Sequence, residues 1–266
     1  EPKGFEHEQK FDLRVSAISL ASQYLLEQLG AWSQVLQWRV CPYKRLGVWE
    51  QEYAYTEFNA KDIEQSHLGH IVENRLLQLS LWQQIKLQKK IEVFCPENLI
   101  SLSQDSNKAT LTLNNSQLTA KLVIAADGAN SQVRQLVDIG TTSWDYQQSA
   151  MLINVKTQLP KQNITWQQYL PNGPVAFLPL SKSSVSVVSN KNQAEQGGYA
   201  SLVWYHQRGE IKRLSALSNQ QLQQEILSAF PKRLGQIEVL NKGAFPLTRR
   251  HANTYQKKRV LLLGDA

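Results

Sequence analysis

The sequence predicts a chain of mixed α/β and α+β character, on two observations. Short apolar runs of strand length stop at Asp127-Gly128 and at Gly264-Asp265, and helices with one apolar face precede the first of them. After Gly140, five spaced strand-like segments follow one another without a helix, which is typical of an antiparallel sheet. The 266 residues suffice for one large domain or two interleaved ones.

The stretch from Leu122 to Arg134 reads L-V-I-A-A-D-G-A-N-S-Q-V-R. Its first five residues predict a strand buried on both faces, and Ala129 to Arg134 can begin a helical turn. Asp127 and Gly128 would then lie at the carboxyl end of that strand, where open α/β sheets bind ligands. The alternative is an ordinary turn, since Asp-Gly is a very common turn dipeptide.

A second apolar run, Leu261 to Leu263, leads into Gly264-Asp265 one residue before the chain stops. The chain opens at Glu1-Pro2 without a methionine. A strand that ends at its ligand-binding tip is an unusual place for a protein to stop. We therefore expect a fragment cut at both ends.

Three helices are predicted from apolar spacing and end signals. One has Leu20, Tyr24, Leu25 and Leu29 on its buried face and ends at Gly30. A second begins at Asn74 as its N-cap and buries Leu77, Leu81, Trp82 and Ile85. A third opens with the capping box Ser218 to Gln221, buries Leu222, Ile226, Leu227 and Phe230, and ends at Pro231.

Strands are predicted in three regions. Cys41 to Asn59 reads as two strands, and Ile91 to Leu118 as short strands with a turn at Asn114-Asn115. The antiparallel segments after Gly140 are Met151 to Lys156, Thr165 to Tyr169, Val175 to Leu180, Val185 to Ser189 and Ala200 to Tyr205. Asn190 to Gly198 reads as a hairpin loop.

Composition excludes several classes of protein. The apolar fraction of 42% and charged fraction of 19% suit a globular protein, and no apolar run approaches membrane-span length. Cys41 and Cys95 form no disulfide framework and lack metal-ligand spacing, so we expect buried thiols, no metal, and a cytoplasmic location. The net charge of +7 is scattered and no nucleic-acid-binding motif accompanies it, although attraction to anionic lipid is open.

Several strings are similar to one family. They are D-L-R-V-S-A-I-S from Asp12, V-E-N-x-x-L-Q from Val72, A-D-G-A-N-S-Q-V-R from Ala126 and G-A-F-P-L-T-R-R-H-A from Gly243. The chain resembles the FAD-dependent aromatic hydroxylases of the p-hydroxybenzoate hydroxylase type, in their ubiquinone-biosynthesis branch. The resemblance covers nearly the whole chain, but Ser183 to Gly197 looks inserted.

The resemblance implies a Rossmann-like FAD-binding domain, discontinuous and incomplete, over residues 1–141 and 251–266. It also implies an inserted, mostly antiparallel β-sheet substrate domain over residues 142–250. The family's first strand and glycine-rich turn would precede Glu1, so the fragment alone should hold FAD poorly and be inactive. NAD(P)H would reduce FAD, dioxygen would add at the flavin C4a carbon, and the resulting hydroperoxide would hydroxylate a polyprenylated benzoquinol.

Site residues follow from the same resemblance. The cofactor-binding set consists of Arg14, Gln78, Asp127, Gly128, Gly264 and Asp265. Pro246 and Leu247 would approach the ring system, although Pro246 alone could be a strand-edge proline. No catalytic side chain is named, because the flavin carries the chemistry. His70 alone is more readily explained as structural than as catalytic.

Alternatives remain open at this stage. A related FAD hydroxylase could act at another ring position or on another aromatic substrate. A different class is a basic nucleic-acid-binding module. The expected partners are a polyprenylated quinol, other enzymes of the ubiquinone pathway and the surface of the inner membrane, with no nucleic acid.

Overall fold

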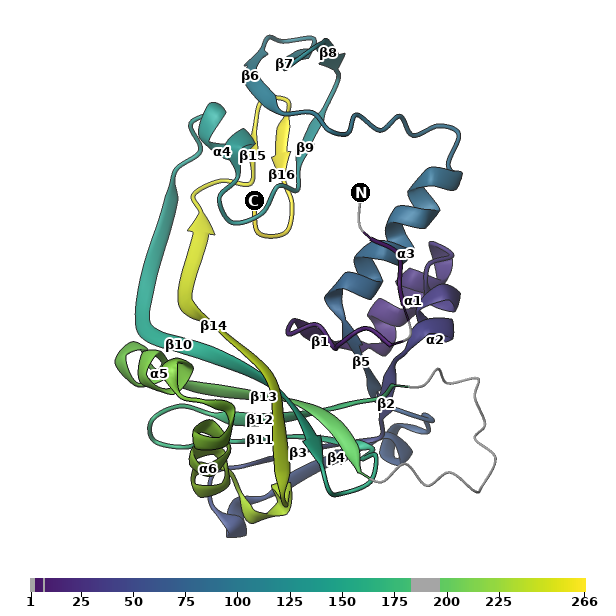
Figure 1. Cartoon of the computed structure of the whole chain (residues 1–266). Helices are drawn as coiled ribbons and strands as arrows, with labels where there is room; N and C mark the ends of the chain where they lie inside the picture. The colour runs from purple at the N-terminus through teal and green to yellow at the C-terminus, as the bar shows by residue number, and fades with distance from the viewer. Residues whose placement is uncertain (1–2, 7, 183–196) are drawn as a thin grey trace. The chain divides into compact units, whose positions relative to one another are not determined.

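The computed structural model describes residues 3–6, 8–182 and 197–266 (Figure 1). The chain divides into two compact units, each built from two stretches of sequence. Unit 1 comprises Glu1–Ile91 and Gln147–Pro246, and unit 2 comprises Glu92–Tyr146 and Leu247–Ala266. Helices and strands occur in both units, which confirms the mixed fold class.

The contact-based division differs from the predicted domains in one respect. It groups Glu1–Ile91 with the antiparallel sheet, whereas the sequence groups this segment with the terminal strand. Compactness does not say which residues bind a cofactor, so the assignment of FAD and substrate domains stays a prediction.

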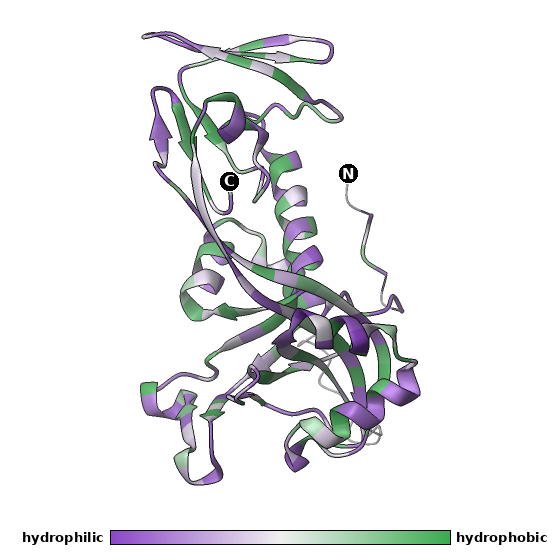
Figure 2. Ribbon diagram, turned by 90° about the vertical axis from the view of Figure 1, so that its left-hand side faces the viewer, coloured by the Kyte–Doolittle hydropathy of each residue, from purple (hydrophilic) through white to green (hydrophobic). Residues whose placement is uncertain are grey.

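Unit 1 contains a small antiparallel sheet with strand order β1-β5-β2. The strands are β1 (Val15–Ser19), β5 (Gly69–Glu73) and β2 (Cys41–Tyr43), and the helices beside them are α1 (Leu20–Gln28), α2 (Trp32–Trp38) and α3 (Asn74–Leu87). Trp32 and Val35 of α2 pack with Leu76 and Leu79 of α3. Figure 2 shows both hydrophobic and hydrophilic residues along α3, and its buried residues Leu76, Leu79 and Ser80 recur at the spacing of one helix face.

Two details of these helices correct the prediction. The expected apolar face of α1 is exposed, with Tyr24 at 63% and Leu25 at 59%, and Leu26 packs inward instead. Asn74 does not cap α3, because it is the helix's first residue and its Oδ1 accepts a hydrogen bond from Ser16 Oγ at 2.6 Å. Gly30 has φ +72°, which confirms it as the left-handed residue that ends α1.

A seven-stranded sheet lies mostly in unit 1, with one end each of β10 and β14 in unit 2, and has the order β14-β10-β13-β12-β11-β3-β4. Its members are β14 (Ile237–Ala252), β10 (Thr141–Thr157), β13 (Gly198–Gln207), β12 (Val175–Leu180), β11 (Ile164–Gln168), β3 (Arg45–Trp49) and β4 (Thr56–Asn59). The β10–β13, β13–β12, β12–β11 and β3–β4 ladders are antiparallel, and β11 runs parallel to β3. This confirms the mostly antiparallel sheet; Val185 to Ser189, and the inserted segment apart from Gly197, lie outside the described residues.

Helices α5 (Arg208–Ala216) and α6 (Asn219–Ala229) cover one face of this sheet. The capping box at Ser218 and Gln221 is confirmed, and so is the burial of Leu222 and Ile226. Short 3-10 turns stand at η1 (Glu52–Ala54), η2 (Ala60–Ile63) and η3 (Lys232–Leu234). Neither α2 nor α5 was predicted from the sequence, because each helix is too short to show a clear helical period of apolar residues.

Unit 2 combines an antiparallel meander with a small mixed sheet. The meander is β6 (Leu99–Gln104), β7 (Ala109–Leu113) and β8 (Gln117–Ala120), and the sheet has the order β15 (Gln256–Lys257), β16 (Val260–Leu262), β9 (Val123–Ala125). The turn at Asn114-Asn115 is confirmed between β7 and β8. One short helix, α4 (Gln132–Leu136), follows β9.

Strand β9 is buried on one face only, which corrects the prediction of burial on both. Val123 and Ala125 are buried, whereas Ile124 is 54% exposed and Leu122 is 51% exposed. The meander residues Leu102 and Leu111 pack in the same cluster as Val123 and Ala125. Successive residues of this continuous apolar run are therefore alternately buried and exposed, because side chains along a strand point to opposite faces of the sheet.

The two cysteines differ. Cys41 is buried, as expected, and burial raises its pKa to about 11 although the positive charge of Lys161 opposes the shift. Cys95 is exposed, so the prediction of a second buried thiol is wrong.

One ion pair organises the start of unit 1. Arg39 donates from Nε to Glu73 Oε2 at 2.6 Å and from Nη2 to Oε1 at 2.8 Å, and both side chains are almost fully buried. The same guanidinium donates to the carbonyls of Gln9 and Lys10 and lies 4.4 Å from the Phe11 ring centroid. The pair thus connects the N-terminal segment to the end of β5.

Replacing Glu73 by Gln should therefore reduce the free energy of unfolding by about 3–5 kcal/mol, because Arg39 would keep a buried charge without its counter-ion. Urea unfolding measures this loss. The control is Glu210→Gln, which breaks an exposed pair with Arg213 and should cost far less. Equal losses in the two variants would contradict a special role for the buried pair.

Candidate functional site

Arg14 and Gln78, which the motifs assign to the cofactor, are brought together in unit 1. The β1–β5 ladder pairs Val15 with Glu73, and the Asn74 N–H donates to the Arg14 carbonyl at 3.0 Å, so the residue before β1 meets the first turn of α3. Both side chains are exposed. They line one hollow of about 630 Å³ together with Asp12, Leu13, Asn74 and Arg75.

The same hollow contains a residue that sequence reasoning missed. Asp12 Oδ2 is buried and has no hydrogen-bond partner among the described residues. An unpaired buried acceptor is costly, and a donor group of a ligand or a water would satisfy it. The available signal was its position, two residues before Arg14 in the same motif.

Asp127 forms the second part of the site, in unit 2. Its Oδ2 accepts from the backbone N–H of Gln132 at 2.8 Å and of Val133 at 3.2 Å, while Ser131 Oγ accepts from the N–H of Arg134. The carboxylate therefore holds the turn after β9 against the start of α4. Asp127 orders the loop, which is one of the two roles its position allows.

The pKa of Asp127 lies below its ordinary value of 3.8. Partial burial acts to raise this pKa, but hydrogen bonds from Ser131 and from backbone N–H groups at Val133 and Gln132 outweigh it. The carboxylate is consequently ionised at neutral pH.

Gly128 and Gly264 lie at the carboxyl ends of adjacent strands, because β9 and β16 run parallel in register from Val123 and Val260. Both glycines are left-handed, with φ of +81° and +68°, and a Cβ at either would meet nothing within 4 Å. Their backbones therefore face open space that a ligand could enter.

Gly264 and Asp265 line a hollow of about 280 Å³ in unit 2 that also includes Ala129, Arg134 and Arg250. Both arginines donate to the Ala129 carbonyl, Arg134 at 3.1 Å, and Arg250 also donates to Asn130 Oδ1. Sequence reasoning missed these two cations, which fix the turn after Asp127-Gly128. The sequence feature that could have indicated Arg134 and Arg250 is their position inside the motifs quoted above.

The substrate-side candidates lie in β14, an edge strand of the seven-stranded sheet. Pro246 is exposed there, and a proline at a sheet edge needs no functional explanation. Nearby in unit 1, a Cβ on Gly243 would come within 2.8 Å of Leu13 Cδ1. The segment beside Arg14 therefore packs closely on β14, three residues before Pro246.

His70 does not join these groups. It is buried among aromatic rings, 5.0 Å from Trp32 and 4.4 Å from His67 between ring centroids. Burial, with the neighbouring His67, lowers its pKa to about 4.

Comparison with known proteins decides the family. A family model described as "FAD binding domain" matches residues 26–266. The chain belongs to the FAD binding domain family. This confirms the resemblance drawn from the motifs, and it favours a flavoprotein over a nucleic-acid-binding module.

Two curated relatives of this FAD binding domain chain are named as ubiquinone-pathway enzymes. The Escherichia coli 3-demethoxyubiquinol 3-hydroxylase is 43% identical over 100% of this chain and 64% of its own length. The Xenopus tropicalis ubiquinone biosynthesis monooxygenase COQ6 is 31% identical over 99% of this chain and 63% of its own length. The chain thus spans slightly less than two thirds of either relative.

Solved structures support the fold. PqsL of Pseudomonas aeruginosa, in a mutant form, matches with a TM-score of 0.70 at 18% identity, over 98% of this chain and 70% of its own. The p-nitrophenol 4-monooxygenase PnpA of Pseudomonas putida matches with a TM-score of 0.69 at 14% identity, over 96% and 63%.

Asp127→Ala should lower the free energy of unfolding at pH 7 by about 0.5–2 kcal/mol, the usual cost of losing a helix cap. Because the folded-state pKa is depressed, this contribution is complete above 3.8 and is lost as pH falls through the folded value. Urea unfolding at pH 7 and pH 5 should show the same difference from the parent protein.

The pH dependence has a direct check. An NMR titration of the Asp127 carboxyl should give a midpoint below 3.8. As a control for the unfolding measurement, Asp62→Ala removes an exposed carboxylate and should change the free energy of unfolding little. A midpoint above 3.8 would show that burial outweighs the hydrogen bonds.

Proposed function

We propose that the complete protein is an FAD-dependent monooxygenase that hydroxylates a polyprenylated benzoquinol in ubiquinone biosynthesis, with NAD(P)H and dioxygen. The observation that carries this is the 43% identity, across the entire chain, to a 3-demethoxyubiquinol 3-hydroxylase. The COQ6 relatives, at 31% and below, make hydroxylation at another ring position the second candidate.

The residues of this chain fit FAD. Two left-handed glycines beside open space, at the ends of parallel strands, allow backbone to approach a dinucleotide, and Asp265 stands next to one of them. Arg14 and Gln78 offer a guanidinium and an amide in one hollow. When bound, FAD accepts electrons from NAD(P)H and activates dioxygen, which side chains alone do not do.

The roles proposed for the protein are therefore binding and exclusion of water. Gly264 and Asp265 hold the ribityl chain, Arg14 and Gln78 contact the cofactor, and Asp127 keeps Gly128 in place. Pro246-Leu247 approaches the ring system. The domain assignment is 1–141 with 251–266 for FAD and 142–250 for substrate.

A polyprenylated quinol is strongly apolar, so its hydroxylase has to meet it at a bilayer. Among the described residues no helix is long and apolar enough to cross a membrane. We place the protein in the cytoplasm, at the inner face of the inner membrane, near other ubiquinone-pathway enzymes.

The function is tested with the complete protein. Purified material should carry flavin absorbance, and NAD(P)H oxidation should couple to gain of one oxygen in a polyprenylated benzoquinol, followed by mass spectrometry. A strain lacking the gene should accumulate the substrate quinol, and its structure fixes the ring position. Accumulation of a quinol lacking a different hydroxyl group would favour the second candidate.

Asp265→Ala in the complete protein should weaken FAD binding by about 1–3 kcal/mol, the scale of a lost hydrogen bond to a buried polar partner. Flavin fluorescence titration of the apoprotein measures the change. Asp62→Ala removes an exposed carboxylate elsewhere and should leave the affinity unchanged. Full FAD retention and normal turnover in the Asp265 variant would remove the assignment.

A further inference from the structure

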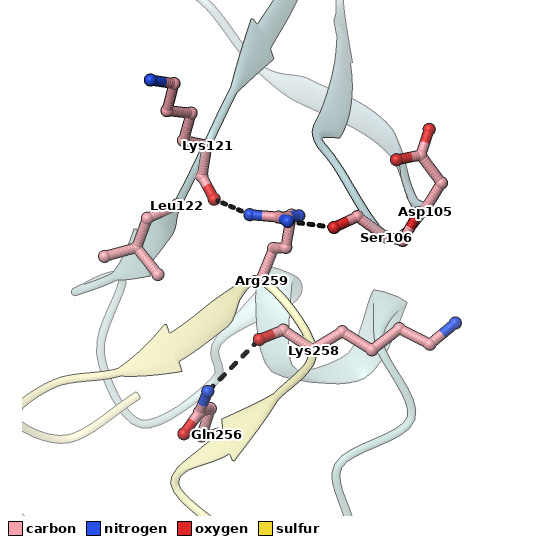
Figure 3. A pocket seen from close by; sticks show the side chains of 7 residues that line it. All are labelled: Asp105, Ser106, Lys121, Leu122, Gln256, Lys258 and Arg259. Atoms are coloured by element: carbon pink, nitrogen blue, oxygen red, sulfur yellow. Dashed lines mark hydrogen bonds between the residues drawn. The ribbon is translucent and has the colours of Figure 1, made fainter.

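A basic hollow of about 660 Å³ lies where the β15–β16 hairpin turns and β9 begins (Figure 3). It is lined by Asp105, Ser106, Lys121, Leu122, Gln256, Lys258 and Arg259. Three of these lining residues are basic and one, Asp105, is acidic, whereas unit 2 as a whole has eight Lys and Arg residues and seven acidic ones. The lining therefore has a net charge of +2 (three basic residues less one acidic), against +1 for unit 2 as a whole (eight less seven).

Arg259 builds the hollow. Its guanidinium donates to the carbonyls of Lys121, at 2.9 Å, and of Ser106, and its own backbone N–H donates to Gln104 Oε1 at 2.9 Å. These bonds hold the hairpin, the meander and the start of β9 together. Nη1 and Nη2 each donate to one of these carbonyls, Nε is buried without a described partner, and the positive charge of the guanidinium remains beneath the hollow.

Lys121 and Lys258 supply free charge at the rim. Figure 3 shows their ammonium groups on different sides of the hollow, each pointing away from Arg259. Neither ammonium group has a hydrogen bond or ion pair with a described residue. Lys258 stands at the hairpin turn with φ +52°, a conformation in which glycine or asparagine is preferred. The turn thus carries a lysine at a conformational cost.

The arrangement suits an extended anionic surface better than a single small anion. Two ammonium groups that diverge cannot both bind one phosphate, and both terminal nitrogens of Arg259 already donate to backbone carbonyls while its Nε is buried. The ammonium groups of Lys121 and Lys258 can, however, each face a separate lipid headgroup in one plane. Leu122, 51% exposed beside Lys121, adds the apolar contact that interfacial binding uses.

We propose that this basic hollow is the surface by which the protein docks on a membrane that contains anionic phospholipids. The choice of partner rests on the proposed function, because a polyprenylated quinol resides in a bilayer. The charge pattern, the diverging lysines and the exposed leucine do not depend on that function.

The test measures binding of the complete, FAD-loaded protein to vesicles of phosphatidylcholine with or without about 30 mol% phosphatidylglycerol at low salt. The variant combines Lys121→Gln with Lys258→Gly, since glycine suits the left-handed turn and should preserve folding. The matched control is Lys89→Gln with Lys90→Gln, two exposed lysines of unit 1.

The parent and the control should bind anionic vesicles equally and neutral vesicles weakly. The hollow variant should bind anionic vesicles about 25-fold more weakly, about fivefold for each charge removed. An equal loss in the control, or no loss in the hollow variant, would overturn the proposal. So would displacement of the parent by inorganic phosphate at matched ionic strength, or binding to duplex DNA that only the hollow variant loses.

A separate readout distinguishes docking from catalysis. Flavin content and quinol hydroxylation in detergent should be the same in the hollow variant and the parent, because no hollow residue belongs to the cofactor site. Vesicle binding that needs the two lysines would stand even if the parent failed to hydroxylate the quinol.

Discussion

The buried pair of Arg39 and Glu73 is the constraint on which the first part of the candidate site depends. Glu73 ends β5, accepts from Arg39 through both oxygens and also accepts from the Asp12 N–H at 2.8 Å. Arg39 at the same time holds the carbonyls of Gln9 and Lys10. The segment that leads into Asp12 and Arg14 is thus held at the first turn of α3, and Gln78 of α3 lines the same hollow. A buried pair adds little net stability over apolar packing, but it sets position sharply because a mispositioned charge is costly.

Unit 2 uses arginine in a comparable way, with backbone carbonyls as partners. Arg134 and Arg250 both donate to the Ala129 carbonyl beside the Asp127-Gly128 turn, and Arg259 donates to the carbonyls of Lys121 and Ser106. A guanidinium has several donors in a fixed plane and can join two loops that share no ladder. These residues increase the protein's net positive charge while serving the fold. Net charge alone is therefore a poor guide to binding partners here, and the free lysine heads carry more information.

Features that depend on local chemistry were predictable from the sequence. The capping box at Ser218, the left-handed Gly30 and the mostly antiparallel sheet each follow from signals within a few residues, and the structure confirms them. The parallel pairing of β9 with β16 was not predicted, although both strands were expected to end at an Asp and Gly dipeptide, Asp127-Gly128 and Gly264-Asp265. Family membership followed from motifs. The residue roles drawn from those motifs stay predictions, since position alone does not test binding.

Features that depend on distant partners were not predictable. An apolar run such as Leu122 to Ala126 reports hydrophobicity, whereas burial of Ile124 depends on what lies on each face of β9. The same limit explains α1, where Tyr24, Leu25 and Leu29 satisfy a helical period yet are exposed, and Leu26 is the residue that packs inward. Asp12 shows the reverse case, because its backbone N–H is paired with Glu73 while Oδ2 has no described partner. A paired backbone and an unpaired carboxylate oxygen, next to Arg14 in one hollow, indicate that this loop is positioned first and completes its hydrogen bonding with a group from outside the chain.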